Sequence, residues 1–286
     1  MNNFENKIDF ALVISVKNAN PNGDPLNGNR PRVNYNSTGE ISDVCIKRKI
    51  RNRLMQEGKN VFVQMNENKL DEYNSLSDRF NAAISKLEKK ASEREKTEFV
   101  CNEWIDVRSF GQVFAFKSTE DKGVSIGIRG PVSIHPAFSI DPINATSIQI
   151  TKSVNSEPVK GGGKSSDTMG MKHRVDFGVY VTYGSINVEL AKKTGFDAED
   201  AKAIKNALAT LFRNDASSAR PEGSMAVEKL IWWQHNTACG QYSSAKVHKS
   251  LTVIKKDPTK DAHSIDDYEI TVKNLEGLEA EIIDGE

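Results

Sequence analysis

The stretch Ile8-Asp9-Phe10-Ala11-Leu12-Val13-Ile14-Ser15-Val16, close to the start of this chain of 286 residues, decides the fold. Large apolar side chains occupy every second position, at Phe10, Leu12, Ile14 and Val16. The positions between them hold Asp9, Ala11, Val13 and Ser15. A period of two is typical of a β-strand, so the segment predicts a half-buried strand with its large side chains in a core.

The residues that follow this strand predict a turn and then a helix. Asn18-Ala19-Asn20-Pro21-Asn22-Gly23-Asp24-Pro25 consists of turn-forming residues, and a loop is expected to continue to about residue 40. Ser42 is suited to cap a helix that runs to about Glu57. Apolar residues four apart define the buried stripe of that helix, at Ile46, Ile50 and Leu54. Arg48 and Asn52 point away from the stripe, with Lys49 and Arg51 toward its edges.

The rest of the chain predicts further strands and helices in an α+β order. The strands are expected at 104–116, at 124–140 with a break at Gly130-Pro131, near 148–153, and at 175–183, 230–235, 251–254 and 268–272. A long amphipathic helix is expected at 70–91, within an insertion, and a second helix after a capping Asp197. Residues 154–174 predict a long loop, as do residues 217–223. This order suits a ferredoxin-like split sheet with helices on one face, the arrangement that also underlies RNA-recognition modules.

Composition limits the class of protein. Hydrophobic residues make up 37% of the chain and no run of eighteen apolar residues exists, so we expect a globular protein without a membrane span. No apolar signal segment follows the N-terminus, so a cytoplasmic location is expected. Cys45, Cys101 and Cys239 lie far apart and form no C-x-x-C pair, which indicates neither a zinc ribbon nor a disulfide framework.

Charge is distributed unevenly although the net charge is zero. Residues 257–286 contain ten acids and two bases, which leaves 37 bases and 29 acids in the other 256 residues. A basic body with an acidic end favours a polyanionic partner such as nucleic acid. A solvated acidic segment without a partner is the alternative.

The helix after Ser42 carries most of the candidate phosphate-binding residues. Five cations fall within seven residues, at Lys47, Arg48, Lys49, Arg51 and Arg53. The free backbone N–H groups of a helix N-terminus at Ser42-Asp43 favour anions, and the preceding loop adds Arg30 and Arg32. Together these groups are able to follow a phosphate backbone, on which arginine binds two oxygens at once. A solvated basic helix face remains the alternative.

A second candidate site is the end of the long loop, Met169-Gly170-Met171-Lys172-His173-Arg174. Met169 and Met171 are suited to wedge between the bases of single-stranded RNA, with Lys172 and His173 near the phosphates. Burial of the two methionines at the base of the loop is the alternative.

Catalysis has little support in the sequence. The five histidines form no zinc-binding pattern, and no serine-nucleophile motif is present. Gly161-Gly162-Gly163-Lys164-Ser165 resembles the end of a P-loop, but Pro158 stands where the first glycine is required. We therefore expect no catalytic residue, metal or cofactor. The remaining catalytic alternative is metal-dependent RNA cleavage, for which Asp24, Asp43 and Asp167 are the candidates near the proposed RNA-contacting segments.

Several motifs together resemble one family. They are residues 18–25, Asn29-Arg30-Pro31-Arg32, residues 42–52, Asp106-Val107-Arg108-Ser109-Phe110-Gly111, Gly130-Pro131-Val132, residues 168–173, and Ser218-Ala219-Arg220-Pro221-Glu222-Gly223-Ser224. In this combination, which spans about residues 8–254, the chain resembles the backbone subunit of Cascade, the type I CRISPR surveillance complex, and is most similar to its type I-C branch.

The resemblance implies a hand-like fold. A modified RNA-recognition-type palm would comprise residues 1–59, 106–149 and 175–256. Residues 60–105 would form a helical fingers insertion and residues 150–174 a thumb loop, with the acidic segment 257–286 at the end.

The resemblance also implies a function without catalysis. Several copies would wrap one CRISPR RNA head-to-tail, together with other Cascade subunits and a target DNA strand paired to the guide, and no membrane would be involved. Lys47, Arg48, Arg51 and Asn52 would hold phosphate and sugar, with Ser42 and Lys49 in the same helix. Asn20, Asn22, Arg30 and Arg32 would line the same channel. Met169 and Met171 would form the wedge of the thumb beside Lys172 and His173, and Arg220 would contact RNA or the next subunit. A general single-stranded RNA-binding protein outside CRISPR is the remaining alternative.

Overall fold

The computed structural model describes residues 3–88, 90–116, 124–155, 157–158 and 169–285. Its helices are α1 (Asp43–Gln56), α2 (Leu76–Ile84), α3 (Glu93–Glu103), α4 (Ile105–Phe110), α5 (Val188–Thr194), α6 (Ala198–Ala209) and α7 (Ser244–His248), with short 3-10 turns η1 (Pro25–Asn27) and η3 (Ile265–Asp267). Its strands are β1 (Ile8–Ala19), β2 (Gly23–Asp24), β3 (Arg30–Pro31), β4 (Thr38–Ile41), β5 (Gly111–Phe116), β6 (Val124–Arg129), β7 (Val132–Ile134), β8 (Ala137–Pro142), β9 (Ala145–Thr151), β10 (Met169–Ile186), β11 (Met225–Gln234), β12 (Leu251–Lys255), β13 (Tyr268–Val272) and β14 (Ala280–Asp284).

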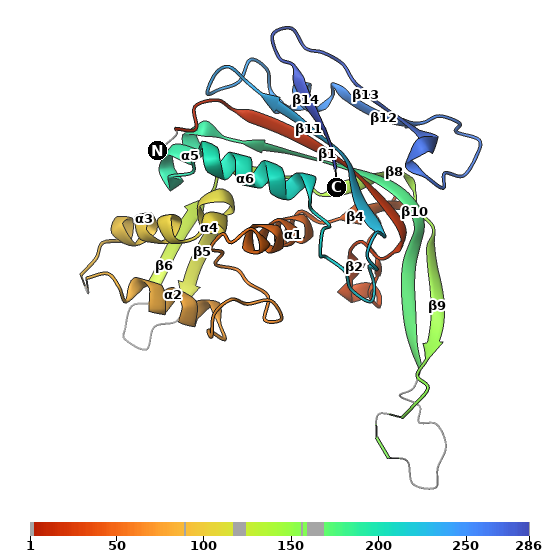
Figure 1. Cartoon of the computed structure of the whole chain (residues 1–286), viewed down its shortest axis with the longest axis horizontal. Helices are drawn as coiled ribbons and strands as arrows, with labels where there is room; N and C mark the ends of the chain where they lie inside the picture. The colour runs from red at the N-terminus through yellow and green to blue at the C-terminus, as the bar shows by residue number, and fades with distance from the viewer. Residues whose placement is uncertain (1–2, 89, 117–123, 156, 159–168, 286) are drawn as a thin grey trace.

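A large antiparallel sheet organises the molecule (Figure 1). Its strand order is β14-β11-β1-β10-β8-β4, and β7 and β9 pair with β10 outside this order. The predicted strand β1 lies between two long partners, with Ile14 opposite Tyr180 of β10 and Ile8 opposite Gln234 of β11. The architecture is therefore mixed α and β around an antiparallel sheet.

Both faces of β1 are buried, so the prediction of a half-buried strand was wrong. Phe10 and Leu12 belong to a core cluster that packs under the helices. Ala11 and Val13 belong to a second cluster, on the other face, with residues of α7, β12 and β13. Asp9 on that face is also fully buried. The layer that covers the second face comes from residues 244–286, and the pattern of β1 alone carries no signal for it.

The two predicted helices on the first face are confirmed. Ser42 caps α1, where its side chain accepts a hydrogen bond from the N–H of Cys45, and Ile46 and Ile50 are buried. Asp197 caps α6 through a capping box with Asp200. Apolar stripes hold both helices on the sheet, because a short helix gains most of its stability from the face that it buries.

A side module with its own core projects from this layer. Its core is formed by α2, α3, α4, the β5–β6 hairpin, the segment before α2 and the residue between α3 and α4; the buried residues are Phe62, Phe80, Ala83, Val100, Cys101, Trp104, Val107, Phe114 and Ile126. The helix predicted over 70–91 is shorter, because Ser75 caps a helix that ends at Ile84. The first half of the strand predicted over 104–116 is helical instead, since α4 follows α3 directly and ends at Gly111, whose φ of 79° suits glycine. The β5–β6 hairpin packs in this module as well, so the module extends past residue 105.

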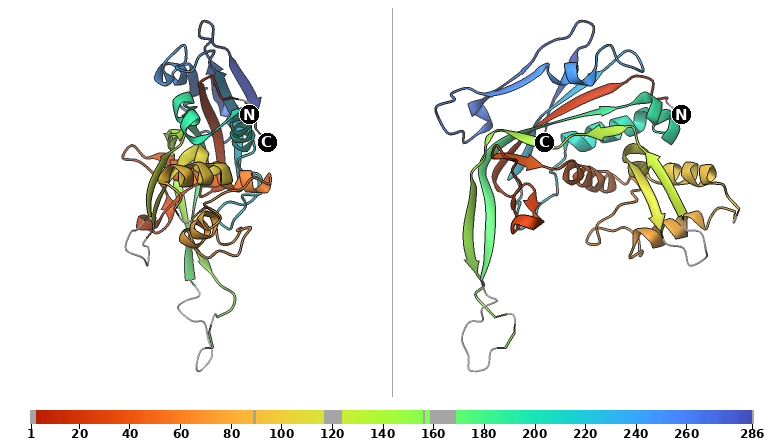
Figure 2. Two further views of the ribbon diagram at one scale, coloured as in Figure 1. Left: turned by 90° about the vertical axis from the view of Figure 1, so that its left-hand side faces the viewer. Right: turned by 180° about the vertical axis from the view of Figure 1, so that it is seen from behind.

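Part of the loop predicted over 154–174 is a strand. Met169 to Val175 of β10 pair with β9, from Met169 opposite Thr151 to Val175 opposite Ala145. This two-stranded arm, residues 145–151 and 169–175, projects from the sheet at the end opposite α5 (Figure 2). Residues 156 and 159–168, with the glycine-rich stretch, lie outside the described residues.

The acidic C-terminal segment belongs to the fold. Its predicted strand is confirmed as β13, which pairs with β12, and β14 adds an edge to the main sheet by pairing with β11. Asp284 forms an ion pair with Lys229 of β11, and Glu281 forms one with Lys205 of α6. No helix within the described ranges is long and apolar enough to cross a membrane.

Candidate nucleic-acid interface

The exposed side of α1 carries four of the predicted RNA-binding residues. In Figure 1 the helix lies between the side module and the arm. Residues four apart share a helix face, so Lys47 pairs with Arg51 and Arg48 with Asn52 on adjacent lines of the helix surface. All four side chains are partly exposed. Arg48 donates to Sδ of Met65 at 3.2 Å, and the Nδ2 of Asn52 lies 3.9 Å from the same atom. A loop of the side module therefore borders this face of α1.

Lys49, also predicted to bind RNA, lies on the opposite side of the helix from this face. Its side chain is fully buried and forms an ion pair with Asp215. Burial lowers the pKa of Lys49, and the nearby Asp215 carboxylate acts in the opposite direction. In this conformation the ammonium group of Lys49 is paired with Asp215 and does not reach solvent.

The same carboxylate links Arg220 to α1. The Nε of Arg220 lies 3.4 Å from Oδ2 of Asp215, so one aspartate holds one cation of the helix and one of the 217–223 loop. The N–H of Asn20 donates to the carbonyl of Ala219 at 2.9 Å. The structure thus links the predicted residues Lys49 and Arg220 through Asp215, and Asn20 to the loop that carries Arg220.

Arg51 is fixed by two contacts. Its Nε donates to Oδ2 of Asp106 at 2.7 Å, and its guanidinium carbon lies 5.1 Å from the centre of the Phe110 ring. Asp106 is buried and also accepts from the backbone N–H groups of Phe62 and Val63, at 2.7 and 3.1 Å. The motif 106–110 therefore joins α1 to the side module.

The predicted asparagines and Ser42 stabilise the loop that leads to α1. The Oδ1 of Asn22 accepts from both the N–H and the hydroxyl of Ser42, at 2.9 and 2.8 Å. Asn20 is buried, and its Nδ2 donates to the carbonyl of Asn29 at 2.7 Å. These side chains hold the loop against the helix N-terminus and so fix the shape of the surface beside it.

Arg30 and Arg32 differ in their surroundings. Arg30 is exposed in β3, which packs near β10. Arg32 is partly buried and lies 3.9 Å from Asp24, and its buried Nε has no hydrogen-bond partner in the described part of the protein. Asp24, one of the candidates for metal-dependent cleavage, caps η1 by accepting from the N–H of Leu26. The described residues contain no group of three or more histidine, cysteine, aspartate or glutamate side chains placed to hold a metal ion.

The arm has two different faces. Directly opposed residues of an antiparallel pair point to the same side, so Met169, Met171 and His173 share one face and Lys172 lies on the other, with Ile148 and Ile150. Met169 and Met171 are 63% and 55% exposed, whereas His173 is buried and contacts Ser147 through its Nδ1 at 2.8 Å. Val175 continues the methionine face into the core under the helices. The methionines therefore face the same side of the sheet as α1.

Sequence reasoning did not single out three further residues. Asp106 and Asp215 hold Arg51 and Arg220, but isolated aspartates carry no signal for the arginine they will meet in the fold. Tyr35 is 95% exposed on a tight turn in which Asn34 accepts hydrogen bonds from the N–H groups of Asn36 and Thr38. A lone aromatic residue within Asn34-Tyr35-Asn36-Ser37 was the available signal for an exposed ring.

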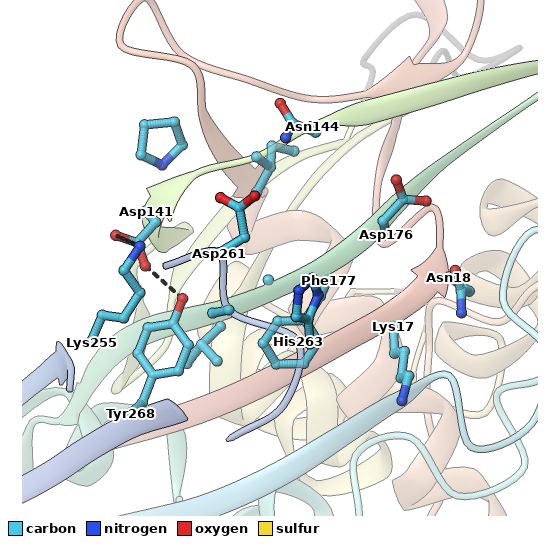
Figure 3. Close-up of a pocket in the computed structure, with 15 residues that line it drawn as sticks. Lys17, Asn18, Asp141, Asn144, Asp176, Phe177, Lys255, Asp261, His263 and Tyr268 are labelled. Atoms are coloured by element: carbon cyan, nitrogen blue, oxygen red, sulfur yellow. Dashed lines mark hydrogen bonds and ion pairs between the residues drawn. The ribbon is translucent and has the colours of Figure 1, made fainter. Parts of the chain in front are cut away.

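A cavity lies elsewhere, between the main sheet and the β12–β13 layer (Figure 3). It has a volume of about 450 Å³ and is lined by Lys17, Asp176, Phe177 and His263, among others. At one end the Tyr268 hydroxyl donates to Asp141 at 2.6 Å; burial and the neighbouring carboxylate raise the pKa of Tyr268. None of the predicted RNA-binding residues lines this cavity.

Comparisons with known protein sequences name one family. The family model described as CRISPR-associated protein Cas7 matches residues 6–273. A CRISPR-associated protein Cas7 of Haloferax volcanii is 21% identical over 285 residues, which cover 94% of this chain and 82% of the relative. Among solved structures, a chain of a CRISPR RNA-guided surveillance complex in a pre-nicking state is 16% identical with a TM-score of 0.46, over 79% of this chain and 78% of that chain. A chain of another CRISPR RNA-guided surveillance complex is 15% identical with a TM-score of 0.41, over 79% of this chain and 68% of that chain. Because the family model matches most of the length of this chain, the chain belongs to the CRISPR-associated protein Cas7 family.

Proposed function

We propose that this chain is a non-catalytic backbone subunit that binds the guide RNA of a Cascade complex. The observation that carries the proposal is the exposed face of α1, where Lys47, Arg48, Arg51 and Asn52 form a cationic and polar strip. Phosphate oxygens are the groups that such side chains bind in every nucleotide, whatever the base. The guide would supply sequence specificity by base pairing, as in other RNA-guided systems.

The parts of the molecule would then have separate roles. The main sheet would be the palm, the side module, with α4 and the β5–β6 hairpin, would be the fingers, and the arm would be the thumb. Met169 and Met171 are suited to contact bases, because they are exposed, apolar and on the side of the sheet that carries α1. Lys172 lies on the outer face of the arm, where it would meet a phosphate or a neighbouring subunit.

The partners follow from this role. Copies that join head-to-tail form an open filament, which suits a linear RNA. Other Cascade subunits and a target DNA strand paired to the guide would complete the assembly in the cytoplasm. The sequence motifs favour the type I-C branch, and co-purification with subunits of that branch is the test of this finer assignment.

A salt titration tests the RNA-binding face. For single-stranded nucleic acid, log K falls with log salt by about 0.7 for each phosphate neutralised. The double variant Lys47→Ala/Arg48→Ala should therefore flatten the slope for a labelled repeat–spacer RNA by about 1.4. A matched control, Lys192→Ala/Lys193→Ala, removes the same charge from α5 and should leave the slope unchanged.

The titration also separates the alternatives. Equal slopes for the two double variants would contradict the placement of the RNA on α1. Cleavage of the RNA in magnesium would favour the ribonuclease alternative. Equally tight binding to RNA that lacks any repeat sequence, without assembly of several copies, would favour a general RNA-binding protein.

A further inference from the structure

The arginines around α1 fall into two groups, according to how many of their guanidinium nitrogens donate hydrogen bonds within the protein. Arg53 donates from all three of its nitrogens, to Thr210, Gln56 and Glu57. Arg108 does the same, with Nε and Nη2 on Asp200 and Nη1 on the carbonyl of Cys101. Every nitrogen of these two guanidinium groups already donates to a protein acceptor, so neither group offers a phosphate a pair of nitrogens without a partner.

Arg51 belongs to the other group. Only its Nε is hydrogen-bonded, to Asp106 at 2.7 Å, and the Phe110 ring packs against the guanidinium. Neither Nη nitrogen has a partner among the described residues, and neither is among the buried polar atoms that lack one. Both Nη groups are therefore accessible, and 14% of the side chain remains exposed. One phosphate oxygen for each Nη is the pairing that the planar guanidinium favours.

We infer that Asp106 is a positioning residue for RNA binding, one that acts through Arg51. The inference rests on the proposed function and names the device that prepares one of its contacts. A free arginine loses rotamer entropy when it binds phosphate, and an arginine already held at Nε and stacked on a ring loses less. Because Asp106 also accepts from the N–H groups of Phe62 and Val63, it sets Arg51 at a fixed place relative to the side module.

Arg220 repeats the arrangement. Its Nε faces Asp215 at 3.4 Å, its Nη groups have no described partner, and 18% of its side chain is exposed. Asp215 also neutralises the buried Lys49, so a change at Asp215 alters folding as well. Asp106 is the clearer place to test positioning.

The sign of the expected effect is informative. Asp106→Asn removes a negative charge from beneath a site for a polyanion, and simple electrostatics predicts equal or tighter RNA binding. Positioning predicts weaker binding, because the Nε anchor is lost.

The experiment is a double-mutant cycle on RNA affinity with the full chain and a labelled repeat–spacer RNA at one salt concentration. Arg51→Ala should weaken binding about tenfold or more, the range expected for hydrogen bonds to charged groups. Asp106→Asn should weaken it severalfold, and the double variant should bind as Arg51→Ala does. The control Asp200→Asn disturbs Arg108, whose three nitrogens all donate to protein acceptors, and should leave RNA affinity unchanged.

Each contrary result has a separate meaning. Loss of affinity with Arg51→Ala but not with Asp106→Asn overturns the inference and leaves the proposed function intact. The inference is also overturned if Asp106→Asn still lowers RNA affinity when Arg51 is already alanine, because the effect of Asp106 then comes from the side module. No loss with Arg51→Ala removes Arg51 from the proposed RNA site. If Asp106→Asn does not fold, Phe110→Leu replaces it in the same cycle, since it removes the stacking surface and should also lose its effect in the Arg51→Ala background.

Discussion

Lys47 and Lys49, two residues apart on α1, should respond to substitution in opposite ways. The Lys49 side chain is fully buried and paired with Asp215, so Lys49→Ala leaves a largely buried carboxylate with only the more distant Arg220. Breaking a buried ion pair from one side costs about 3–5 kcal/mol. At about 2–4 °C per kcal/mol for a chain of this size, the melting temperature should fall by roughly 6–20 °C.

Lys47 forms an ion pair with Asp43, four residues away, and its side chain is 24% exposed. Loss of such a surface pair costs about 0.3–0.5 kcal/mol, so Lys47→Ala should melt close to the wild type. It should instead flatten the salt dependence of RNA binding by about 0.7.

Thermal melting followed by circular dichroism and an RNA titration across salt measure the two effects on the same preparations. Lys49→Met serves as a control, because it keeps the volume of the side chain while it removes the charge. If Lys49→Ala melted like the wild type and flattened the salt slope as much as Lys47→Ala, Lys49 would be an RNA ligand and the burial argument would be refuted.

Three further predictions concern stability and RNA contact. His248 is buried beside Asp9, and burial lowers its pKa, so the folded protein should lose stability as pH falls below about 6.5. His248→Phe should reduce the pH dependence of the free energy of unfolding, measured in urea, between about pH 6.5 and 5, and an unchanged pH profile would count against this prediction. Tyr35→Ala should weaken the binding of single-stranded RNA, because an exposed aromatic ring can stack on a base. The melting temperature should hardly change, because the side chain is 95% exposed, and an unaltered RNA affinity would place Tyr35 outside the RNA path. Gly39→Ala should destabilise the fold by about 1–3 kcal/mol, because the added Cβ would lie 2.3 Å from the hydroxyl of the buried Tyr180. The control Gly127→Ala, whose Cβ would meet nothing within 4 Å, should leave the melting temperature unchanged.

Local patterns predicted the elements whose signals lie within one segment. The alternation in residues 8–16 and the cap and stripe of residues 42–57 gave β1 and α1, since both depend on neighbours in sequence. The helix over 70–91 was overestimated because its apolar period continues beyond both ends of α2, which begins after the capping Ser75 and ends at Ile84. The second covered face of β1 depends on segments more than two hundred residues away, and the edge strand β14 depends on pairing with β11 across several intervening elements, so one strand pattern has no signal for either.

The candidate site was predicted by residue type more than by geometry. Lys47, Arg48, Arg51 and Asn52 share the exposed side of α1, as the helical period indicated. The period placed Lys49 at the edge of the buried stripe, but only the fold brings Asp215 to its ammonium group. Asn20, Asn22 and Ser42 bind one another or the loop backbone, which their turn and cap chemistry also explains. Anchors such as Asp106 become visible only when distant segments meet.

The most direct test of the central claim is the mass of the complex formed with guide RNA. The purified chain, or the chain co-expressed with its neighbouring subunits, would be mixed with repeat–spacer RNAs of increasing spacer length and weighed by native mass spectrometry in the presence of magnesium. We expect several copies of the chain on each intact RNA, with a copy number that rises in step with spacer length. A fixed single copy at every length, or an RNA that is cut, would contradict the account.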